Sequence, residues 1–222
     1  MAQFPSTQWS LIVRSGETPS VRHVAFSELA RGYRSAIVQF FRARLGPQNA
    51  EDATQSFLAA SYEHAWWSRA DVALGSFRGF LLMLLHRHLG RVRQNRVDAI
   101  YDIAVETLVD NTPSAEQQFD TRFAVVLTSR AIDGLRARYR ERGRDGLLEQ
   151  LLPLLSSRPE HGQLKTVAQT LQMPANSLTI ELKRLRSRLR EQLREELKDL
   201  CIDEAAFESE WVALQDVLSG RH

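Results

Sequence analysis

The 222-residue sequence predicts an all-α protein built as two small helical bundles joined by a linker. Three observations lead to this prediction. Apolar residues recur at intervals of three and four along most of the chain, which is the spacing of one face of an α-helix. Strand-like alternation beside hairpin dipeptides is absent, as are internal repeats and low-complexity tracts. Short stretches rich in proline and glycine separate the helical segments.

The first bundle is expected to consist mainly of three helices. The first spans 21–45, with core-spaced apolar residues, and Gly46-Pro47 stops it because proline donates no backbone hydrogen bond. Asn49 is a candidate cap for the next helix, whose acidic first turn favours the positive end of the helix dipole. That helix is expected to reach residue 68. The third spans about 76–96 and becomes basic in its second half.

The pattern loosens after residue 96, and turn and cap signals occupy 111–114. These signals place an interdomain linker at 98–113. Helices are then expected over 115–142 and 147–155. The predicted organisation is therefore a first domain at 1–97, the linker, a second domain at 114–200 and an acidic, amphipathic C-terminal helix at 201–222.

The segment 164–190 reads as a short helix, a tight break at Met173-Pro174 and a basic second helix. Asn176 and Ser177 are candidate caps, and the second helix is expected to bury Leu178, Leu182 and Leu185. A short helix that holds a basic helix is typical of a helix-turn-helix, in which the second helix enters the major groove. The alternative is a helical hairpin with a solvated charged face.

Composition excludes several classes of protein. Catalytic motifs are missing, among them the phosphate-binding glycine loop, H-E-x-x-H, G-x-S-x-G and a cysteine pair, so we expect neither an enzyme nor a cofactor. His86 and His88 lie two apart on a helix and point apart, which argues against a metal site. The single Cys201 excludes an internal disulfide. With no long apolar run and no export signal, a cytoplasmic protein is expected.

Three motifs occur in order: Ala50-Glu51-Asp52-Ala53-Thr54-Gln55, then Phe77-Arg78-Gly79-Phe80-Leu81, then the basic helix ending in Leu182-Lys183-Arg184-Leu185-Arg186. Together they resemble extracytoplasmic-function (ECF) sigma factors, small members of the sigma-70 family of bacterial RNA polymerase subunits. The run Phe4-Pro5-Ser6-Thr7-Gln8-Trp9-Ser10-Leu11 resembles the start of one subgroup. The resemblance covers about residues 4–200.

The resemblance implies transcription initiation. Domain two, at 1–97, would bind core RNA polymerase and open the minus-ten element of promoter DNA. Domain four, at 114–200, would read the minus-thirty-five element. An anti-sigma factor or a Ser/Thr kinase would be further partners. The alternative is a helix-turn-helix transcriptional regulator that binds DNA without joining polymerase.

Three groups of candidate site residues follow. Polymerase binding is assigned to Asn49, Glu51, Asp52, Gln55 and Ser56. Contacts with minus-ten DNA are assigned to Arg78, Arg87, His88, Arg91, Arg93 and Arg96. Contacts with minus-thirty-five DNA are assigned to Asn176, Ser177, Thr179, Lys183, Arg184, Arg186 and Arg188. Glu181 is also expected on the groove-facing side. Polar side chains early in that helix can read base edges, and the later arginines would contact phosphate.

Two regulatory features are also expected. The resembled family would place acidic residues at positions 49, 52 and 56, but the chain has Asn49, Asp52 and Ser56. Phosphorylation of Thr54 or Ser56 would restore negative charge, although Thr54 also fits a packing position.

In the tail, Phe207, Trp211, Leu214 and Leu218 form one apolar stripe of a helix. This helix either completes the core of domain four or folds back over the basic binding surfaces.

Overall fold

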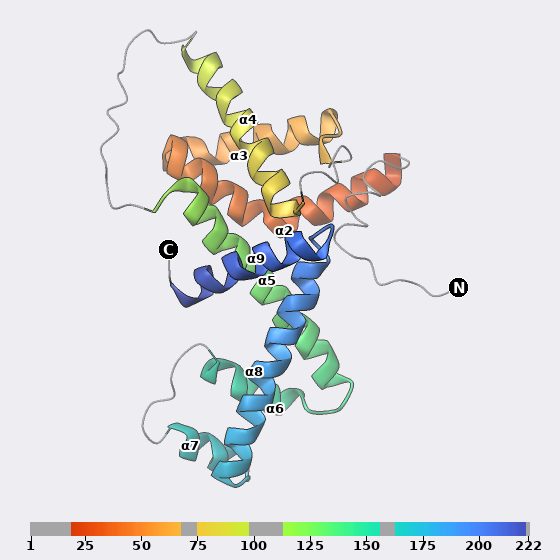
Figure 1. Cartoon of the computed structure of the whole chain (residues 1–222), viewed down its shortest axis with the longest axis vertical. Helices are drawn as coiled ribbons and strands as arrows, with labels where there is room; N and C mark the ends of the chain where they lie inside the picture. The colour runs from red at the N-terminus through yellow and green to blue at the C-terminus, as the bar shows by residue number, and fades with distance from the viewer. Residues whose placement is uncertain (1–18, 68–74, 98–112, 156–162, 221–222) are drawn as a thin grey trace. The chain divides into compact units, whose positions relative to one another are not determined.

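The computed structural model describes residues 19–67, 75–97, 113–155 and 163–220, and every element in them is helical. The order of the elements is α2 (Pro19–Leu45), α3 (Pro47–Glu63), α4 (Phe77–Val97), α5 (Ala115–Arg140), α6 (Asp145–Leu151), the 3₁₀ helix η3 (Leu152–Leu154), α7 (Gln163–Thr170), α8 (Ala175–Lys198) and α9 (Glu204–Ser219) (Figure 1). The predicted all-α class is confirmed. The amino-terminal motif at 4–11 and nearly all of the proposed linker lie outside the described residues.

The chain divides into two compact units. Unit 1 comprises Met1–Val126 and Leu197–His222, and unit 2 comprises Leu127–Glu196. The division therefore falls inside α5 and α8, and not at the expected boundaries near residues 113 and 200. The start of α5 belongs to unit 1 because its aromatic residues pack there: the Phe123 ring stacks on Tyr33, with 5.4 Å between the ring centroids.

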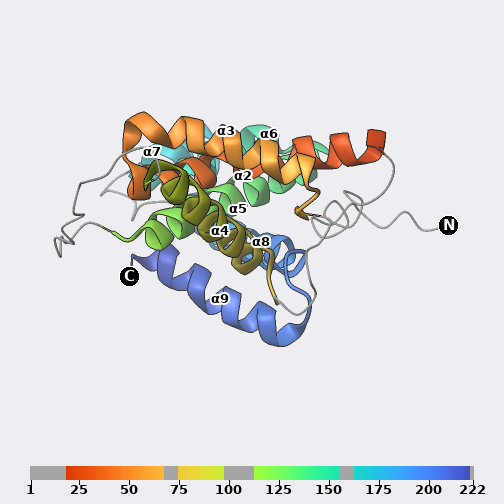
Figure 2. The same cartoon turned by 90° about the horizontal axis from the view of Figure 1, so that it is seen from above.

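Unit 1 is organised around α2 and α3, which pack along each other (Figure 2). Gly46 makes the turn between them with a φ of 78°, a left-handed conformation that glycine adopts without steric cost. The helix α3 begins at Pro47, so the prediction that Asn49 caps it is wrong. The side-chain amide of Asn49 instead donates to the carbonyl of Leu45 over 2.9 Å.

The core of unit 2 joins both halves of the segment predicted to be a helix-turn-helix. Leu178, Leu182 and Leu185 of α8 are buried as predicted, against α7 and α6. Gln172 takes a φ of 51° in the turn between α7 and α8, and Met173 donates its N–H back to Ala168 over 3.0 Å. Because α8 begins at Ala175, Asn176 and Ser177 lie in its first turn and are not caps.

The C-terminal helix α9 belongs to unit 1, so the expectation that it completes the core of domain four is wrong. The chain reaches it through backbone pairing, in which Phe77 donates its N–H to Leu200 and Ile202 donates to Gly75. Three of the four residues of the predicted stripe, Phe207, Trp211 and Leu214, are buried, and Leu218 is exposed. Asp203 caps the helix by accepting the N–H of Ala206 over 2.8 Å.

Three charged side chains join α9 to two other helices of unit 1. Arg78 of α4 donates to Glu210 of α9 over 2.6 Å and to Asp120 of α5 over 2.8 Å. Ser76 also donates to Glu210, over 2.8 Å. Burial alone lowers the pKa of the Arg78 guanidinium, but its interactions with Glu210 and then Asp120 raise the pKa above its ordinary value. Arg78 is therefore a structural cation at this junction, and these ion pairs argue against its predicted contact with minus-ten DNA.

Candidate nucleic-acid interface

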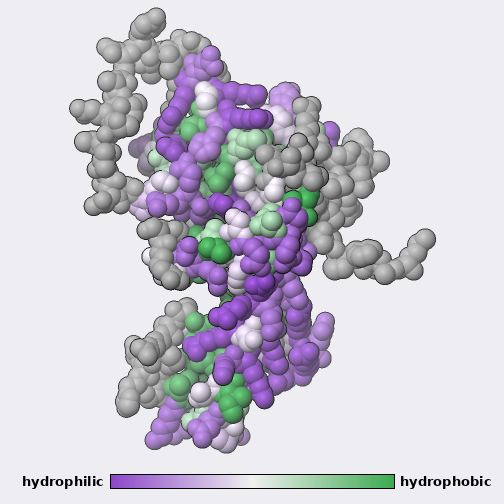
Figure 3. Space-filling view, in the orientation of Figure 1, coloured by the Kyte–Doolittle hydropathy of each residue, from purple (hydrophilic) through white to green (hydrophobic). Residues whose placement is uncertain are grey.

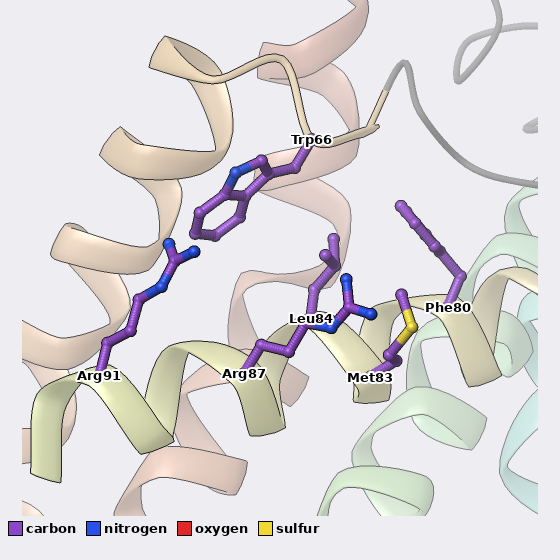
Figure 4. A pocket seen from close by; sticks show the side chains of 6 residues that line it. All are labelled: Trp66, Phe80, Met83, Leu84, Arg87 and Arg91. Atoms are coloured by element: carbon purple, nitrogen blue, oxygen red, sulfur yellow. The ribbon is translucent and has the colours of Figure 1, made fainter. Parts of the chain in front are cut away.

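A pocket of about 210 Å³ opens beside α4 (Figure 4). Five of its lining residues follow one stripe of that helix, with apolar residues first and arginines last: Phe80, Met83, Leu84, Arg87 and Arg91. Trp66, which follows α3, faces them from across the pocket. An apolar floor, an indole and two guanidinium groups therefore meet in one cavity, a combination that suits a flat, apolar-faced and negatively charged ligand.

The end of α3 positions Trp66. The helix ends at Glu63, and Ala65 turns the chain with a φ of 49°, a left-handed conformation that is uncommon for a residue other than glycine. The N–H of Trp66 then donates to the carbonyl of Ser61 over 3.0 Å. This reversal directs the indole back over α4, so the side chain is half-buried and not part of the core.

Trp66 and Arg91 form a cation–π pair, with the guanidinium carbon 5.2 Å from the ring. Such a pair at a partly exposed site contributes about 1 kcal/mol. His64 stacks on the same indole at 5.9 Å. These contacts hold the ring in place before any ligand arrives, which lowers the entropic cost of binding.

His88 lies behind the indole and is buried, so the prediction that it contacts DNA is wrong. Its Nε2 lies 2.7 Å from the Ser56 hydroxyl, and its ring meets Trp66 edge-on at 6.2 Å. Burial, and secondarily the charge of Arg91, lowers the pKa of His88 below 6.5. The neutral ring supports Trp66. Its position in the sequence, four residues after Leu84 on the buried face of α4, could have indicated this.

We expect unit 1 to lose stability as the pH falls below 6.5. Because the folded-state pKa of His88 is lower than its unfolded value, the unfolded chain binds the proton more readily. The stabilisation is therefore fully present above 6.5 and is lost as the pH falls through the folded pKa. Urea unfolding at pH 8 and pH 5.5, followed by tryptophan fluorescence, measures this loss.

The variant His88→Gln should flatten the pH dependence. The control is His86→Gln, at an exposed histidine of the same helix that pairs with Glu116. It should leave the loss between pH 8 and pH 5.5 in place. If His88→Gln retains the full loss, the neutral, buried ring is not its source.

The remaining candidate residues for contact with minus-ten DNA are exposed wherever the structure describes their side chains. Arg87, Arg91 and Arg93 are exposed on α4. Arg96 belongs to the same helix, but its side chain lies outside the described part of the structure. The basic half of α4 thus offers guanidinium groups next to the pocket, as phosphate binding requires.

The candidate polymerase-binding residues divide by exposure. Glu51, Asp52, Gln55 and Ser56 are exposed on α3, and Asn49 is half-buried. Glu51 forms an ion pair with Arg34 of α2. Four of the five thus remain accessible to a partner, and Asp52 provides an acidic side chain near the middle of the set.

The two candidate phosphorylation sites have different outcomes. Thr54 is fully buried, and its hydroxyl donates to the carbonyl of Ala50 over 2.8 Å. A kinase cannot reach it in the folded chain, so that prediction is wrong and its packing alternative holds. Ser56 is exposed, although its hydroxyl lies 2.7 Å from Nε2 of His88, and its phosphorylation stays a prediction.

In unit 2, the first turns of α8 present an exposed polar face. Asn176, Thr179, Lys183 and Arg184 are exposed, and Ser177 is half-buried. Glu181 was also expected on this face but is buried, and it pairs with Arg184 over 2.9 Å and with Arg144 over 3.3 Å. The side of α8 drawn in Figure 3 is largely hydrophilic.

The two later arginines of α8 are engaged within unit 2. Arg186 donates to the carbonyl of Leu154 over 3.1 Å. Arg188 is half-buried, donates to the Tyr139 hydroxyl over 2.7 Å and lies over its ring. These internal bonds would compete with the predicted contacts of both side chains with DNA phosphate. No local sequence pattern indicates these bonds, because their partners are 32 and 49 residues away.

Comparison with known proteins yields no match to this chain among family models, curated proteins or solved structures. None of the described helices is long and apolar enough to cross a membrane.

Proposed function

We propose that this chain is a sigma factor of the extracytoplasmic-function type, which directs bacterial core RNA polymerase to promoters and starts transcription. It acts by binding in the cytoplasm, needs no cofactor and catalyses no reaction of its own. Its partners are the core enzyme and promoter DNA. The observation that carries the proposal is the pocket on α4, where Trp66 and Arg91 pair at the end of an apolar floor.

The chemistry of that pocket fits a base that has left the DNA stack. A flipped or single-stranded base needs a flat aromatic platform, because stacking on it replaces the lost base stacking. Its phosphate needs a cation nearby, and Arg87 and Arg91 line the same cavity. A sigma factor opens the duplex and must hold such a base.

Unit 2 fits the second task, the reading of duplex DNA. The turn between α7 and α8 and the exposed polar start of α8 suit a helix-turn-helix whose second helix enters the major groove. A regulator that works without polymerase would need unit 2 but would have no use for a base pocket or an exposed acidic α3. The two functions therefore differ in their requirement for core polymerase.

The test is binding of the fluorescently labelled full chain to core RNA polymerase without DNA. We expect saturable binding, and we expect Asp52→Arg to weaken it about tenfold because a charge reversal at an interface opposes a complementary surface. Glu28→Arg, a charge reversal on an exposed site of α2, is the matched control and should bind normally. If the wild-type chain ignores core polymerase yet binds specific duplex DNA alone, the regulator function replaces this proposal.

A further inference from the structure

One large apolar side chain interrupts the polar face of α8. Ile180 is 52% exposed, in the second turn of the helix. Exposed polar residues surround it at helical spacing: Asn176 one turn before, and Lys183 and Arg184 one turn after. The buried stripe of α8 begins at Leu178, two residues earlier, so Ile180 points to the opposite side of the helix.

Folding of α8 does not require an isoleucine at this position. A β-branched residue has lower helix propensity than the lysine, glutamate or alanine that an exposed helical site would otherwise carry. About half of the surface of Ile180 stays in water, so packing within unit 2 uses only part of the side chain. The side chain is therefore available to contact a partner.

We infer that Ile180 recognises the C5-methyl group of a thymine in the major groove of the minus-thirty-five element, an inference that rests on the proposed function of α8. Thymine alone among the four bases presents a methyl group in that groove, and an apolar side chain is its complement. The stiff isoleucine side chain loses little rotamer freedom on contact. Asn176 and Lys183, on either side, supply donors for the acceptors of neighbouring bases.

The experiment uses the full chain with core RNA polymerase and duplex promoter fragments selected by this complex. Each thymine of the minus-thirty-five element is replaced in turn by deoxyuridine, which lacks only the methyl group. At one position the wild-type complex should lose about fourfold in affinity, the effect of one methyl group returned to water. The complex with Ile180→Ala should bind the thymine promoter at least fourfold more weakly than the wild-type complex. Its affinity should not fall further when deoxyuridine replaces that thymine.

Two variants complete the design. Ile180→Val keeps a branched apolar side chain and should keep most of the sensitivity to deoxyuridine. Val125→Ala truncates a β-branched residue of α5 that is 47% exposed, and it should behave as wild type.

The inference is overturned if Ile180→Ala remains fully sensitive to deoxyuridine or binds the thymine promoter normally. It is also overturned if Ile180→Ala weakens the affinity for core polymerase without DNA, since Ile180 would then contact protein. The variant Lys183→Ala distinguishes a failure of the inference about Ile180 from a failure of the proposed function. If Lys183→Ala impairs promoter binding while Ile180→Ala does not, α8 still reads DNA, and if neither variant has an effect, α8 is not the reading helix.

Discussion

A chain truncated after Leu200 is expected to lose helical content and to melt at a temperature lower by on the order of 15 °C. The truncation removes three buried side chains of α9, Phe207, Trp211 and Leu214. At about 2 kcal/mol each they contribute roughly 6 kcal/mol, and a chain of this size loses about 2–4 °C per kcal/mol. Circular dichroism and calorimetry measure both effects. We expect no gain in affinity for promoter or polymerase, because the buried side chains of α9 make it part of the core of unit 1.

Two point variants on α9 sharpen this test. Trp211→Ala should cost about 3–5 kcal/mol, the usual range for a buried aromatic residue. Val212→Ala, at the neighbouring position that is 56% exposed, is the matched control and should leave the melting temperature nearly unchanged. If the truncated chain stays fully folded and binds promoter more tightly, α9 is a restraint and not part of the core.

The thiol of Cys201 reports on the docking of α9 independently of melting. Burial, and then the charges of Glu210 and Asp203, raises the pKa of Cys201 to about 12. At pH 8 its thiolate is therefore far rarer than that of an ordinary cysteine, and alkylation should be much slower. Trp211→Ala should accelerate the alkylation, whereas Val212→Ala should not.

The second large effect is expected at the pocket. Trp66→Ala should reduce promoter opening by the chain with core polymerase about 10- to 100-fold, because stacking of one base on an aromatic ring is worth about 1–3 kcal/mol. Fluorescence of 2-aminopurine placed in the minus-ten element measures opening. Trp66→Phe keeps an aromatic face and should recover part of the activity.

The control for Trp66 is a similar pair elsewhere in unit 1. The guanidinium of Arg22 lies 5.3 Å from the ring of Tyr62, so Tyr62→Ala removes an aromatic–arginine contact that does not line the pocket. It should open the promoter like wild type. Normal opening by a folded Trp66→Ala variant would show that the pocket does not hold a base.

Local patterns predicted most of the fold. Apolar spacing located the helices of both units, and it placed Leu178, Leu182 and Leu185 on the buried side of α8. The errors at Asn49 and Asn176 are displacements of a helix start by a few residues, because Pro47 and Ala175 open the helices earlier. Helix ends are set by marginal local energies, so such displacements are common.

The site was less predictable because its decisive contacts are distant in sequence. In the sequence, Arg78 resembles a DNA-binding arginine on a basic helix. In the structure it pairs with Glu210, which lies 132 residues away. Likewise, the bond between His88 and Ser56 joins two helices. The sequence does not distinguish a core position from a stacking role for Trp66, and only the left-handed turn at Ala65 places its indole over α4. Contacts between helices that are distant in sequence determine the surroundings of these side chains, and the spacing of apolar residues does not reveal such contacts.

Run-off transcription with purified core polymerase tests the central proposal most directly. The template is a mixture of genomic fragments, and the full chain is added to core enzyme that lacks any other sigma factor. We expect discrete transcripts that appear only with the chain and that decline sharply with Trp66→Ala and with Lys183→Ala, but not with Tyr62→Ala. Specific binding of the chain alone to DNA fragments, with no transcript above that of core enzyme, would contradict the proposal.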